Sequence, residues 1–553
     1  MRNFYSHEKI FYSFIVLWML IGAVVLYAVN NNEVYSDSSW GRNKYNDGEV
    51  CDKNEDEVYL AKVRTLNEIL TKLRDHYVDE LDMEELLDAA IDGVLSKVDP
   101  HTDYFDEDEL CLFMSSAQGE FGGLGISIDK IDDYITVISP IEGTPAYKMG
   151  IIAGDKLSKI NGESIVGVSI EESIKKMRGP AGSKIVLTVE RPGIGELDFE
   201  IQRDVIKIKS VPYAFKLDNG AGYIRIRQFN SHTAKEFAKA LDDLENKGIK
   251  GLIIDLRSNP GGLLSQAIDT VNEFVGKDKC VVFTKGRSIE ANQQYYTKYD
   301  RIREDYPVVV LINEASASAS EIFAGSIQDW DRGLLVGKTS FGKGSVQNIE
   351  QLYSGGIKIT TSKYYIHSGR CIHKELNDKI LRGKEVSEKE REIIESENHK
   401  KEYFTENGRK VFGGGGVTPD VKVENDYLSD LGIKINQKNL FFSYSVDYFR
   451  DNKDKINEDF KLNDSLINDF YEYLAENGIN YSETEKDSIA DWIKINLEAS
   501  IIEKKYGELA GYKKRLGTDL QFIAAKNLFE KYKTLDEMFK YAESLQKKDE
   551  EKR

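Results

Sequence analysis

Two uninterrupted apolar runs, each followed at once by small or turn-forming residues, constrain the fold of this chain more than any other feature. GLIIDLR (251–257) leads into SNPGG (258–262), and VVVLIN (308–313) leads into EASASAS (314–320). A strand that is apolar on both faces belongs inside a sheet that has helices on each side. Segments with helical periodicity separate such runs. Residues 220–370 are therefore predicted to form an α/β domain with a largely parallel sheet.

A chain of 553 residues is too long for one domain, and its composition changes along its length. Residues 119–205 alternate apolar and polar residues between glycines, which predicts strands with two helices. Near the C-terminus a stripe of apolar residues at helical spacing predicts buried helices: Leu528, Tyr532, Leu535, Phe539 and Ala542. The predicted divisions are a linker (30–55), N-terminal helices (56–118), the strand-rich domain (119–205), the α/β core (206–428) with a charged, solvated insertion (374–411), and C-terminal helices (429–553).

The N-terminal run FYSFIVLWMLIGAVVLYAV (11–29) is long enough to span a bilayer as a single transmembrane helix. Arg2 and Lys9 precede it and Glu33 follows it, so the positive-inside rule keeps the short N-terminus in the cytoplasm. We expect a retained anchor with the rest of the chain outside. The alternative is a cleaved signal peptide with Ala28 before the cut.

The formal net charge of −19 and the lack of a basic stripe argue against a nucleic-acid partner. The four cysteines have no CxxC spacing, and the seven histidines are not spaced with them as metal ligands. No metal and no cofactor is predicted. The cysteines are Cys51, Cys111, Cys280 and Cys371.

The alternate serines of EASASAS are candidate nucleophiles. Ser318 opens an S-x-x-E capping box with Glu321, so its hydroxyl has a structural explanation as a helix cap. A serine at a helix start also lies at the positive end of the helix dipole, which suits a nucleophile whose attack creates negative charge. The residues alone do not choose among Ser316, Ser318 and Ser320.

A serine nucleophile needs a base, and the candidate is Lys343 in TSFGKGSVQ (339–347). Burial disfavours the ammonium form and makes a neutral amine available as a base, whereas a solvated lysine stays charged. Gln347 lies four residues on and is placed to orient the amine. His232 and His367 are the nearest histidines in sequence, but neither lies in a small-residue context at a strand end.

The glycines of SNPGG allow backbone amides to approach a ligand closely, so Gly261 and Gly262 are candidate donors to an oxyanion. An ordinary Asn-Pro-Gly turn explains the same residues.

Taken together, SASASEIFAGSIQDWDRGLLVGKTSFGKGSVQ resembles the catalytic block of the C-terminal processing (tail-specific) peptidases, which are serine proteases with a Ser/Lys dyad. The serine and the lysine are 25 residues apart. LIIDLRSNPGGLL, SGRCI, GGGGVTPD and AAIDGVLSKVDPHTDYF match the family in order, over roughly residues 58–425. The resemblance implies a crotonase-like mixed sheet with Ser318 as nucleophile and Lys343 as base. It also implies that Gln347 supports Lys343 and that Ala319 and Gly261 donate to the oxyanion.

The domain at 119–205 resembles the PDZ domain that this family inserts before its core. GGLGI matches the loop that holds a terminal carboxylate while the peptide extends a sheet edge. The implied peptide-binding residues are Gly122, Gly123, Leu124, Gly125, Ile126 and Ile128. The implied substrates are proteins with free, apolar C-termini. Arg178, in MRGPAGS, is a candidate for coupling this domain to the active site. The alternative for GGLGI is a glycine hairpin without a ligand.

The resulting prediction is a membrane-anchored serine endopeptidase of a bacterial inner membrane, facing the periplasm or the exterior. A catalytically silent PDZ scaffold that only binds protein tails is the main alternative, and a crotonase-type enzyme acting on thioesters is a second. Three roles stay open for the insertion at 374–411 and for the C-terminal helices: covering the site, forming homo-oligomers or recruiting an adaptor.

Overall fold

The computed structural model describes residues 55–300, 303, 305–374, 401–424 and 429–551. The chain forms two compact units, Met1–Glu85 and Leu86–Arg553. Within the described ranges, no helix combines the length and the apolarity that crossing a membrane requires. The predicted anchor at 11–29 lies outside the described residues, as does Cys51.

The N-terminal helices follow the predicted pattern. Helix α2 (Glu55–His76) belongs to the first unit and α3 (Met83–Leu95) spans the boundary. Helix α4 (Glu107–Gln118) begins at Asp106, whose carboxylate accepts a hydrogen bond from the Glu109 N–H at 2.7 Å. Asp106, Glu107 and Asp108 are therefore part of a helix start.

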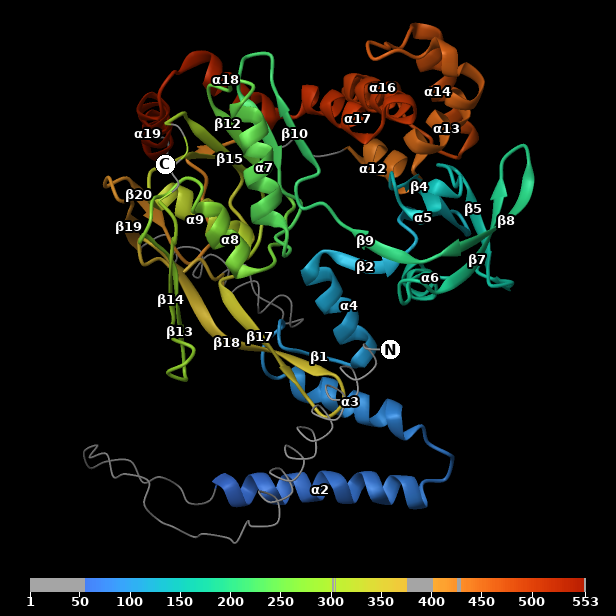
Figure 1. Cartoon of the computed structure of the whole chain (residues 1–553), viewed down its shortest axis with the longest axis vertical. Helices are drawn as coiled ribbons and strands as arrows, with labels where there is room; N and C mark the ends of the chain where they lie inside the picture. Colours follow the sequence, from blue (N-terminus) through green and yellow to red (C-terminus); the bar gives the residue numbers. More distant parts are fainter. Residues whose placement is uncertain (1–54, 301–302, 304, 375–400, 425–428, 552–553) are drawn as a thin grey trace, which may run out of the picture. The chain divides into compact units, whose positions relative to one another are not determined.

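The α/β core is built on a six-stranded sheet in the order β10-β11-β12-β15-β16-β21, of which Figure 1 labels β10, β12 and β15. From β11 to β21 the strands are parallel, and only the edge strand β10 is antiparallel. The largely parallel sheet predicted from the apolar runs is confirmed. Its strands are β10 (Tyr213–Lys216), β11 (Gly222–Arg225), β12 (Leu252–Asp255), β15 (Val308–Ile312), β16 (Leu334–Gly337) and β21 (Val421–Lys422).

Helices cover both faces of this sheet, which explains why its strands are apolar on both sides. Ile254 and Val310 pack with α7 (Thr233–Glu245), α8 (Leu264–Val271) and α9 (Ala319–Asp329). The alternate residues of the same strands face the opposite side. There Ile253, Val309 and Val336 pack with α18 (Leu520–Lys531) and α19 (Leu535–Glu551). The predicted apolar stripe at 528–542 lies in this second layer.

An antiparallel sheet adjoins the core. Strands β17 (Ser345–Gln351) and β18 (Gly356–Ile366) form a hairpin. Strand β18 also pairs with β1 (Asp103–Phe105) and β13 (Cys280–Gly286), and β13 pairs with β14 (Gln294–Tyr296). The core is therefore a mixed α/β structure.

The domain within 119–205 has its own apolar core and its own antiparallel sheet, in the order β3-β4-β5-β7-β8 with β6 (Glu163–Ser164) beside β5. Strands β2 (Glu120–Gly123) and β9 (Asp204–Lys207) pair where the chain enters and leaves it. The sheet strands are β3 (Ile126–Ile131), β4 (Tyr134–Pro140), β5 (Lys156–Ile160), β7 (Lys184–Arg191) and β8 (Gly195–Gln202), and the helices are α5 (Pro145–Lys148) and α6 (Ile170–Met177).

The C-terminal helices divide into two groups. The first group encloses an apolar cluster of its own, rich in aromatic residues such as Phe470. The second group, α18 and α19, completes the core sheet as described above. The first group consists of α12 (Asp430–Gln437), α13 (Leu440–Asn452), α14 (Asp464–Glu476), α15 (Glu483–Ser488) and α16 (Ala490–Tyr506), and α17 (Glu508–Arg515) connects it to the second.

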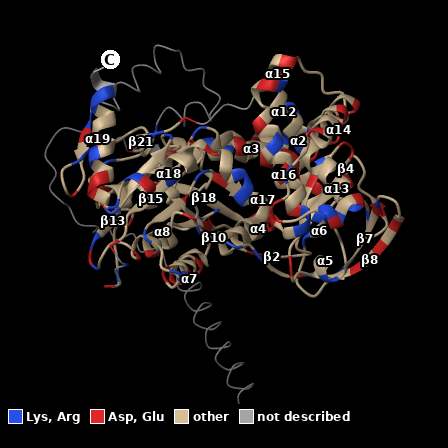
Figure 2. Ribbon diagram, turned by 90° about the horizontal axis from the view of Figure 1, so that it is seen from above, with Lys and Arg blue, Asp and Glu red and all other residues tan. Residues whose placement is uncertain are grey.

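The charged insertion was expected to be solvated, but its described end is docked on the core. Strands β19 (Glu402–Phe404) and β20 (Lys410–Phe412) form a hairpin. Arg409 beside it contacts Asp331 at 2.6 Å and Asp420 at 2.7 Å, and both carboxylates are buried. Residues 375–400 lie outside the described residues. Figure 2 shows acidic and basic residues interspersed along most elements.

Candidate active site

The three serines of EASASAS have different environments. The Ser316 hydroxyl donates to the Leu256 carbonyl at 2.8 Å, and the Ser320 hydroxyl donates to the Asn259 carbonyl at 3.0 Å. Both side chains are fully buried, and their hydroxyls join the segment that leads into and begins α9 to the segment that follows β12. The hydroxyls of Ser316 and Ser320 thus have structural hydrogen-bond partners. Ser318 is the one of the three that is partly exposed.

Ser318 is the N-cap of α9 and has φ 55° and ψ −115°. A positive φ is strained for a residue with a side chain, and such strain persists only where the surroundings impose it. The following N–H, that of Ala319, has no acceptor among the described residues. A free amide at a helix start, next to a serine side chain, is suited to bind a developing oxyanion.

The turn after β12 lies directly against this serine. Gly261 has φ 97°, and a Cβ atom on it would lie 2.6 Å from the Ala317 carbonyl oxygen and 2.8 Å from the Ala319 nitrogen. Only glycine permits this approach. The Gly261 N–H donates to the Asn259 side-chain oxygen at 2.9 Å, so this conformation does not offer it to a ligand. The Gly262 N–H has no acceptor among the described residues.

Lys343 lies in the turn between β16 and β17 and is partly buried. Burial lowers the pKa of its ammonium group, and the charge of Lys358 lowers that pKa further. Glu321 and Asp99 act in the opposite direction but do not cancel the effect of burial. The predicted shift of this amine toward its neutral form therefore has a physical cause in the structure.

Glu321 joins the serine and the lysine through the backbone. One carboxylate oxygen accepts the Ser318 N–H at 2.8 Å and the Lys343 N–H at 2.9 Å. The other accepts the Ser340 hydroxyl at 2.5 Å and the Gly342 N–H at 2.7 Å. Burial raises the pKa of Glu321 to about 7, against the effect of these four donors. The S-x-x-E pattern identified Glu321 as a helix cap, but nothing in the sequence indicated its bonds to residues 340–343.

The backbone nitrogens of the predicted dyad lie on one Glu321 oxygen, but the Ser318 and Lys343 side chains are not hydrogen-bonded to each other in the described structure. The Gln347 amide donates to the Ser345 hydroxyl at 2.9 Å and to the Thr360 hydroxyl at 3.2 Å, instead of contacting the Lys343 amine. Thr360 in turn donates to Asp99 at 3.1 Å. Gln347 is thus part of a polar chain beside Lys343.

The GGLGI residues form a loop that leads into the edge strand β3. The N–H groups of Leu124 and Gly125 have no acceptor among the described residues. Gly122 and Gly123 end β2, Ile126 begins β3, and Ile128 packs against the core of this domain. Helix α6 lies beside β3. A free loop before a sheet edge with a helix alongside is an arrangement that can receive a peptide end.

Arg178 follows α6, and its guanidinium lies 4.7 Å from the centre of the Phe121 ring on β2. Burial lowers the pKa of this guanidinium. Its contact is therefore with the strand pair that connects the small domain to the rest of the chain.

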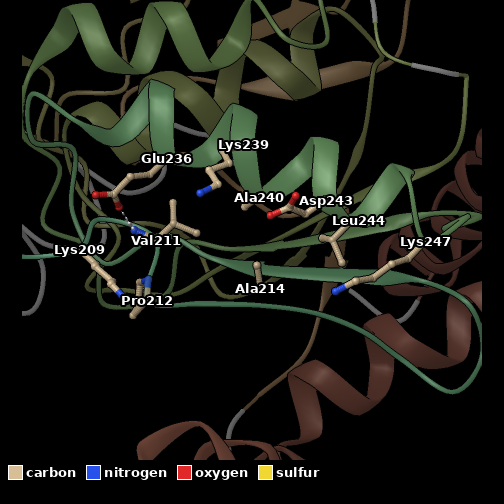
Figure 3. Close-up of a pocket in the computed structure, with 10 residues that line it drawn as sticks. All are labelled: Lys209, Val211, Pro212, Ala214, Glu236, Lys239, Ala240, Asp243, Leu244 and Lys247. Carbon is tan, nitrogen blue, oxygen red and sulfur yellow. Dashed lines mark hydrogen bonds between the residues drawn. The ribbon is translucent and has the colours of Figure 1, made fainter. Parts of the chain in front are cut away.

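A separate hollow of about 390 Å³ lies between β10 and α7, and Figure 3 shows its lining residues. In it the Glu236 carboxylate accepts the Val211 N–H at 2.9 Å. None of the predicted site residues lines this hollow.

Comparison with known families assigns most of these regions. Residues 220–381 match peptidase family S41, and residues 136–191 match the PDZ domain. Residues 19–109 match the N-terminal domain of the activating protease CtpB. Residues 433–507, in the C-terminal helices, match a family of unknown function.

Individual relatives agree. A carboxy-terminal-processing protease of Bartonella bacilliformis is 41% identical over 329 residues, which cover 58% of this chain and 75% of the relative. The carboxy-terminal processing protease CtpA of Bacillus subtilis is 31% identical over 455 residues, covering 81% of this chain and 91% of the relative. The solved structure of a photosystem II D1 C-terminal processing protease is 23% identical, covers 66% of this chain and 93% of its own, and has a TM-score of 0.35. The chain belongs to peptidase family S41, as a carboxy-terminal processing serine protease with a PDZ domain.

Proposed function

We propose that Ser318 is the nucleophile and Lys343 the general base of this protease. The observation that carries the assignment is the shared carboxylate oxygen of Glu321, which accepts the backbone N–H of both residues. Because both N–H groups bind the same oxygen atom, the backbones of Ser318 and Lys343 stay close together in every conformation of their side chains. The alternative serines, Ser316 and Ser320, have hydroxyls committed to backbone carbonyls.

The two side chains meet when the lysine stem rotates toward the serine. A lysine stem has several rotatable bonds, so this needs no change in the backbone. Catalytic hydrogen bonds are often long or absent without substrate and form in the complex. Gln347 and Thr360, which form a polar chain to Asp99, are proposed to support the amine in that position.

In the reaction the neutral Lys343 amine takes the Ser318 hydroxyl proton while the serine oxygen bonds to the scissile carbonyl carbon. The carbonyl oxygen becomes negative and is bound by the Ala319 N–H and by an N–H of the turn 261–262, where Gly261 must first leave Asn259. The C–N bond then breaks and the Lys343 ammonium protonates the leaving amine. Water hydrolyses the resulting ester with Lys343 again as the base.

We infer that the PDZ domain binds the free, apolar C-terminus of the protein substrate. The free N–H groups of Leu124 and Gly125 would hold the terminal carboxylate, the last residues would extend β3, and Ile128 would line the side-chain pocket. A substrate and its C-terminally amidated form separate this proposal from non-selective cleavage. We expect the amide to be cleaved more slowly, through a higher KM, and equal rates would contradict this.

We further propose that residues 11–29 are retained as a membrane anchor, with the protease on the periplasmic or outer side of a bacterial inner membrane. The support is the apolar run and the charges around it. Fractionation and N-terminal mass spectrometry of the mature chain test this. A soluble chain that begins after Ala28 would contradict it.

Ser318→Ala and Lys343→Ala should each abolish cleavage of a peptide with a free apolar C-terminus. Ser318→Ala should also abolish labelling by a fluorophosphonate, which reacts with activated serines. The control is Ser326→Ala in the same helix, whose buried hydroxyl donates to the Val281 carbonyl. It should keep both activities. Labelling that survives in Ser318→Ala would remove this residue from the mechanism.

A further inference from the structure

We propose that Tyr364 is a positioning residue, whose hydroxyl fixes the backbone of the nucleophile and of the base relative to each other. This proposal rests on the assignment of Ser318 and Lys343 above. The Tyr364 hydroxyl lies 2.5 Å from the Lys343 carbonyl oxygen and 3.1 Å from the Ser318 carbonyl oxygen. A single phenol proton is therefore shared between the carbonyls of the two proposed catalytic residues.

Tyr364 itself is firmly held. It lies near the C-terminal end of β18, paired with Thr284 of β13, and its N–H donates to the Gly344 carbonyl at 2.9 Å. The side chain is 1% exposed and its ring packs in the main apolar cluster of the core. The hydroxyl thus projects from a rigid strand toward the start of α9 and the turn that carries Lys343.

The phenol remains a donor under working conditions. Burial raises the pKa of Tyr364 well above its ordinary value, and the charge of Glu321 acts in the same direction. Since both of its neighbours are carbonyl oxygens, the hydroxyl can only donate to them.

The two carbonyls depend on this hydroxyl to different degrees. The Ser318 carbonyl also accepts the N–H groups of Glu321 at 2.9 Å and Ile322 at 3.0 Å. For the Lys343 carbonyl, Tyr364 is the one donor found in the described parts of the chain. Loss of the hydroxyl should therefore loosen the Lys343 carbonyl, while Glu321 still holds the Lys343 N–H and α9 keeps its start.

Tyr364 also helps to hold Ser318 in its strained backbone conformation. The Ser318 N–H is held by Glu321, and its carbonyl is held by Tyr364 and by α9. A positive φ at a serine persists only when contacts on both sides impose it. A loosely held nucleophile and base react slowly, because small displacements from the reactive geometry cost large factors in rate.

The test is Tyr364→Phe, which removes one oxygen and keeps the ring. We expect kcat to fall roughly 10- to 100-fold with KM nearly unchanged, since the peptide-binding loop is untouched. The rate of fluorophosphonate labelling should fall by a similar factor. p-Aminophenylalanine at position 364, which restores a donor at the same place, should recover most of the lost rate.

The matched control is Tyr306→Phe. Tyr306 is 6% exposed, and its hydroxyl donates to Glu245 at 2.7 Å, away from the dyad. Both variants lose a buried hydroxyl bond, so both should lose similar thermal stability, but only Tyr364→Phe should lose kcat. Equal losses of kcat in the two variants, or wild-type kcat in Tyr364→Phe, would overturn the proposal. Failure of the dyad assignment is a separate result, namely activity that persists in Ser318→Ala.

Discussion

Two buried carboxylates lie at the end of the core sheet where the parallel strands end. Both are inaccessible to solvent, but their surroundings shift their pKa values in opposite directions. Asp255 ends β12 and Glu321 lies in the first turn of α9, and each has 0% of its surface exposed. Asp255 contacts two guanidinium groups, those of Arg225 at 2.8 Å and Arg257 at 2.7 Å. Glu321 has four donors, all of them neutral.

The difference between charged and neutral donors determines which of the two carboxylates stays ionised. Burial alone would raise the pKa of Asp255, but Arg257 and Arg225 hold it well below the usual range. Burial raises the pKa of Glu321 to about 7, because hydrogen bonds from neutral groups do not replace lost hydration. Asp255 is thus a fixed anion just before the turn at 258–262, whereas Glu321, which holds the backbone of the proposed dyad, changes charge near neutral pH.

The largest effect on stability should follow from removing the charge of Asp255, which is paired with two arginines. Asp255→Asn leaves two buried guanidinium groups without their common anion, and we expect a loss of about 3–5 kcal/mol in the free energy of unfolding. Urea denaturation followed by tryptophan fluorescence measures it. The control is Asp155→Asn in the PDZ domain, where a single arginine, Arg191, is the partner. A cost below about 1 kcal/mol for Asp255→Asn would show that the pairing is not what stabilises this edge.

The second effect is a dependence of stability on pH that has opposite directions for the two groups. Between pH 4.5 and about 7 the unfolded chain loses the Glu321 proton first, so the stability contributed by this group falls as pH rises. The raised pKa corresponds to about 3 kcal/mol over that window. The contribution of Asp255 is instead present above its usual pKa of 3.8 and is lost as the pH falls below it.

Glu321→Gln isolates the pH-dependent stability contributed by Glu321, because glutamine does not titrate. We expect the difference in unfolding free energy between wild type and Glu321→Gln to shrink steadily from pH 5 to pH 7.5 in urea titrations. A difference that stays constant over this range would mean that Glu321 is ionised throughout.

The same variant should lower activity. Each Glu321 oxygen accepts two donors, so an amide NH₂ in place of either oxygen faces donors instead of acceptors. We expect kcat to fall roughly 10- to 100-fold, equivalent to about 1.4–2.7 kcal/mol, with KM nearly unchanged. Gln328→Glu is an unsuitable control because it creates a buried charge. Ser326→Ala, in the same helix, serves instead and should keep its kcat.

The sequence indicated the three serines, Lys343 and the strands before them because these features are local, and the family resemblance selected Ser318. The apolar runs show a parallel sheet, and the small residues after them show where backbone approaches closely. The capping box predicted one contact of Glu321, its bond to the Ser318 N–H. Its bonds to the turn at 340–343 come from tertiary packing, and no spacing along the chain indicates them.

The Asp255 network was missed for the same reason. In GLIIDLR the two charged residues are consistent with a strand end, and nothing there identifies their partners. Arg257 pairs with Asp519, which caps α18 more than 250 residues later. The sequence showed that the C-terminal helices have a buried stripe. Which surface the stripe covers depends on the shape of the whole sheet.

The smallest expected effect tests how much the C-terminal helices stabilise the end of β12 that carries Asp255. Tyr512 in α17 lies 2.6 Å from the Tyr223 hydroxyl, and Tyr223 donates its proton to Asp255 at 2.7 Å. Tyr512 must therefore be the donor to Tyr223, which polarises that hydroxyl toward the carboxylate. Tyr512→Phe should cost about 1 kcal/mol in urea unfolding, with kcat unchanged.

Tyr213→Phe is the control for this last effect. Tyr213 stacks on Tyr512 with ring centres 4.2 Å apart, but its hydroxyl makes a long, exposed contact of 3.4 Å with Glu508. Its loss should change stability by less than about 0.5 kcal/mol. If the two variants cost the same, the stacked rings rather than the hydroxyl chain join α17 to the core. In that case Tyr512 would contribute little to the fixed charge of Asp255, and the contrast with Glu321 would be due mainly to the two guanidinium groups.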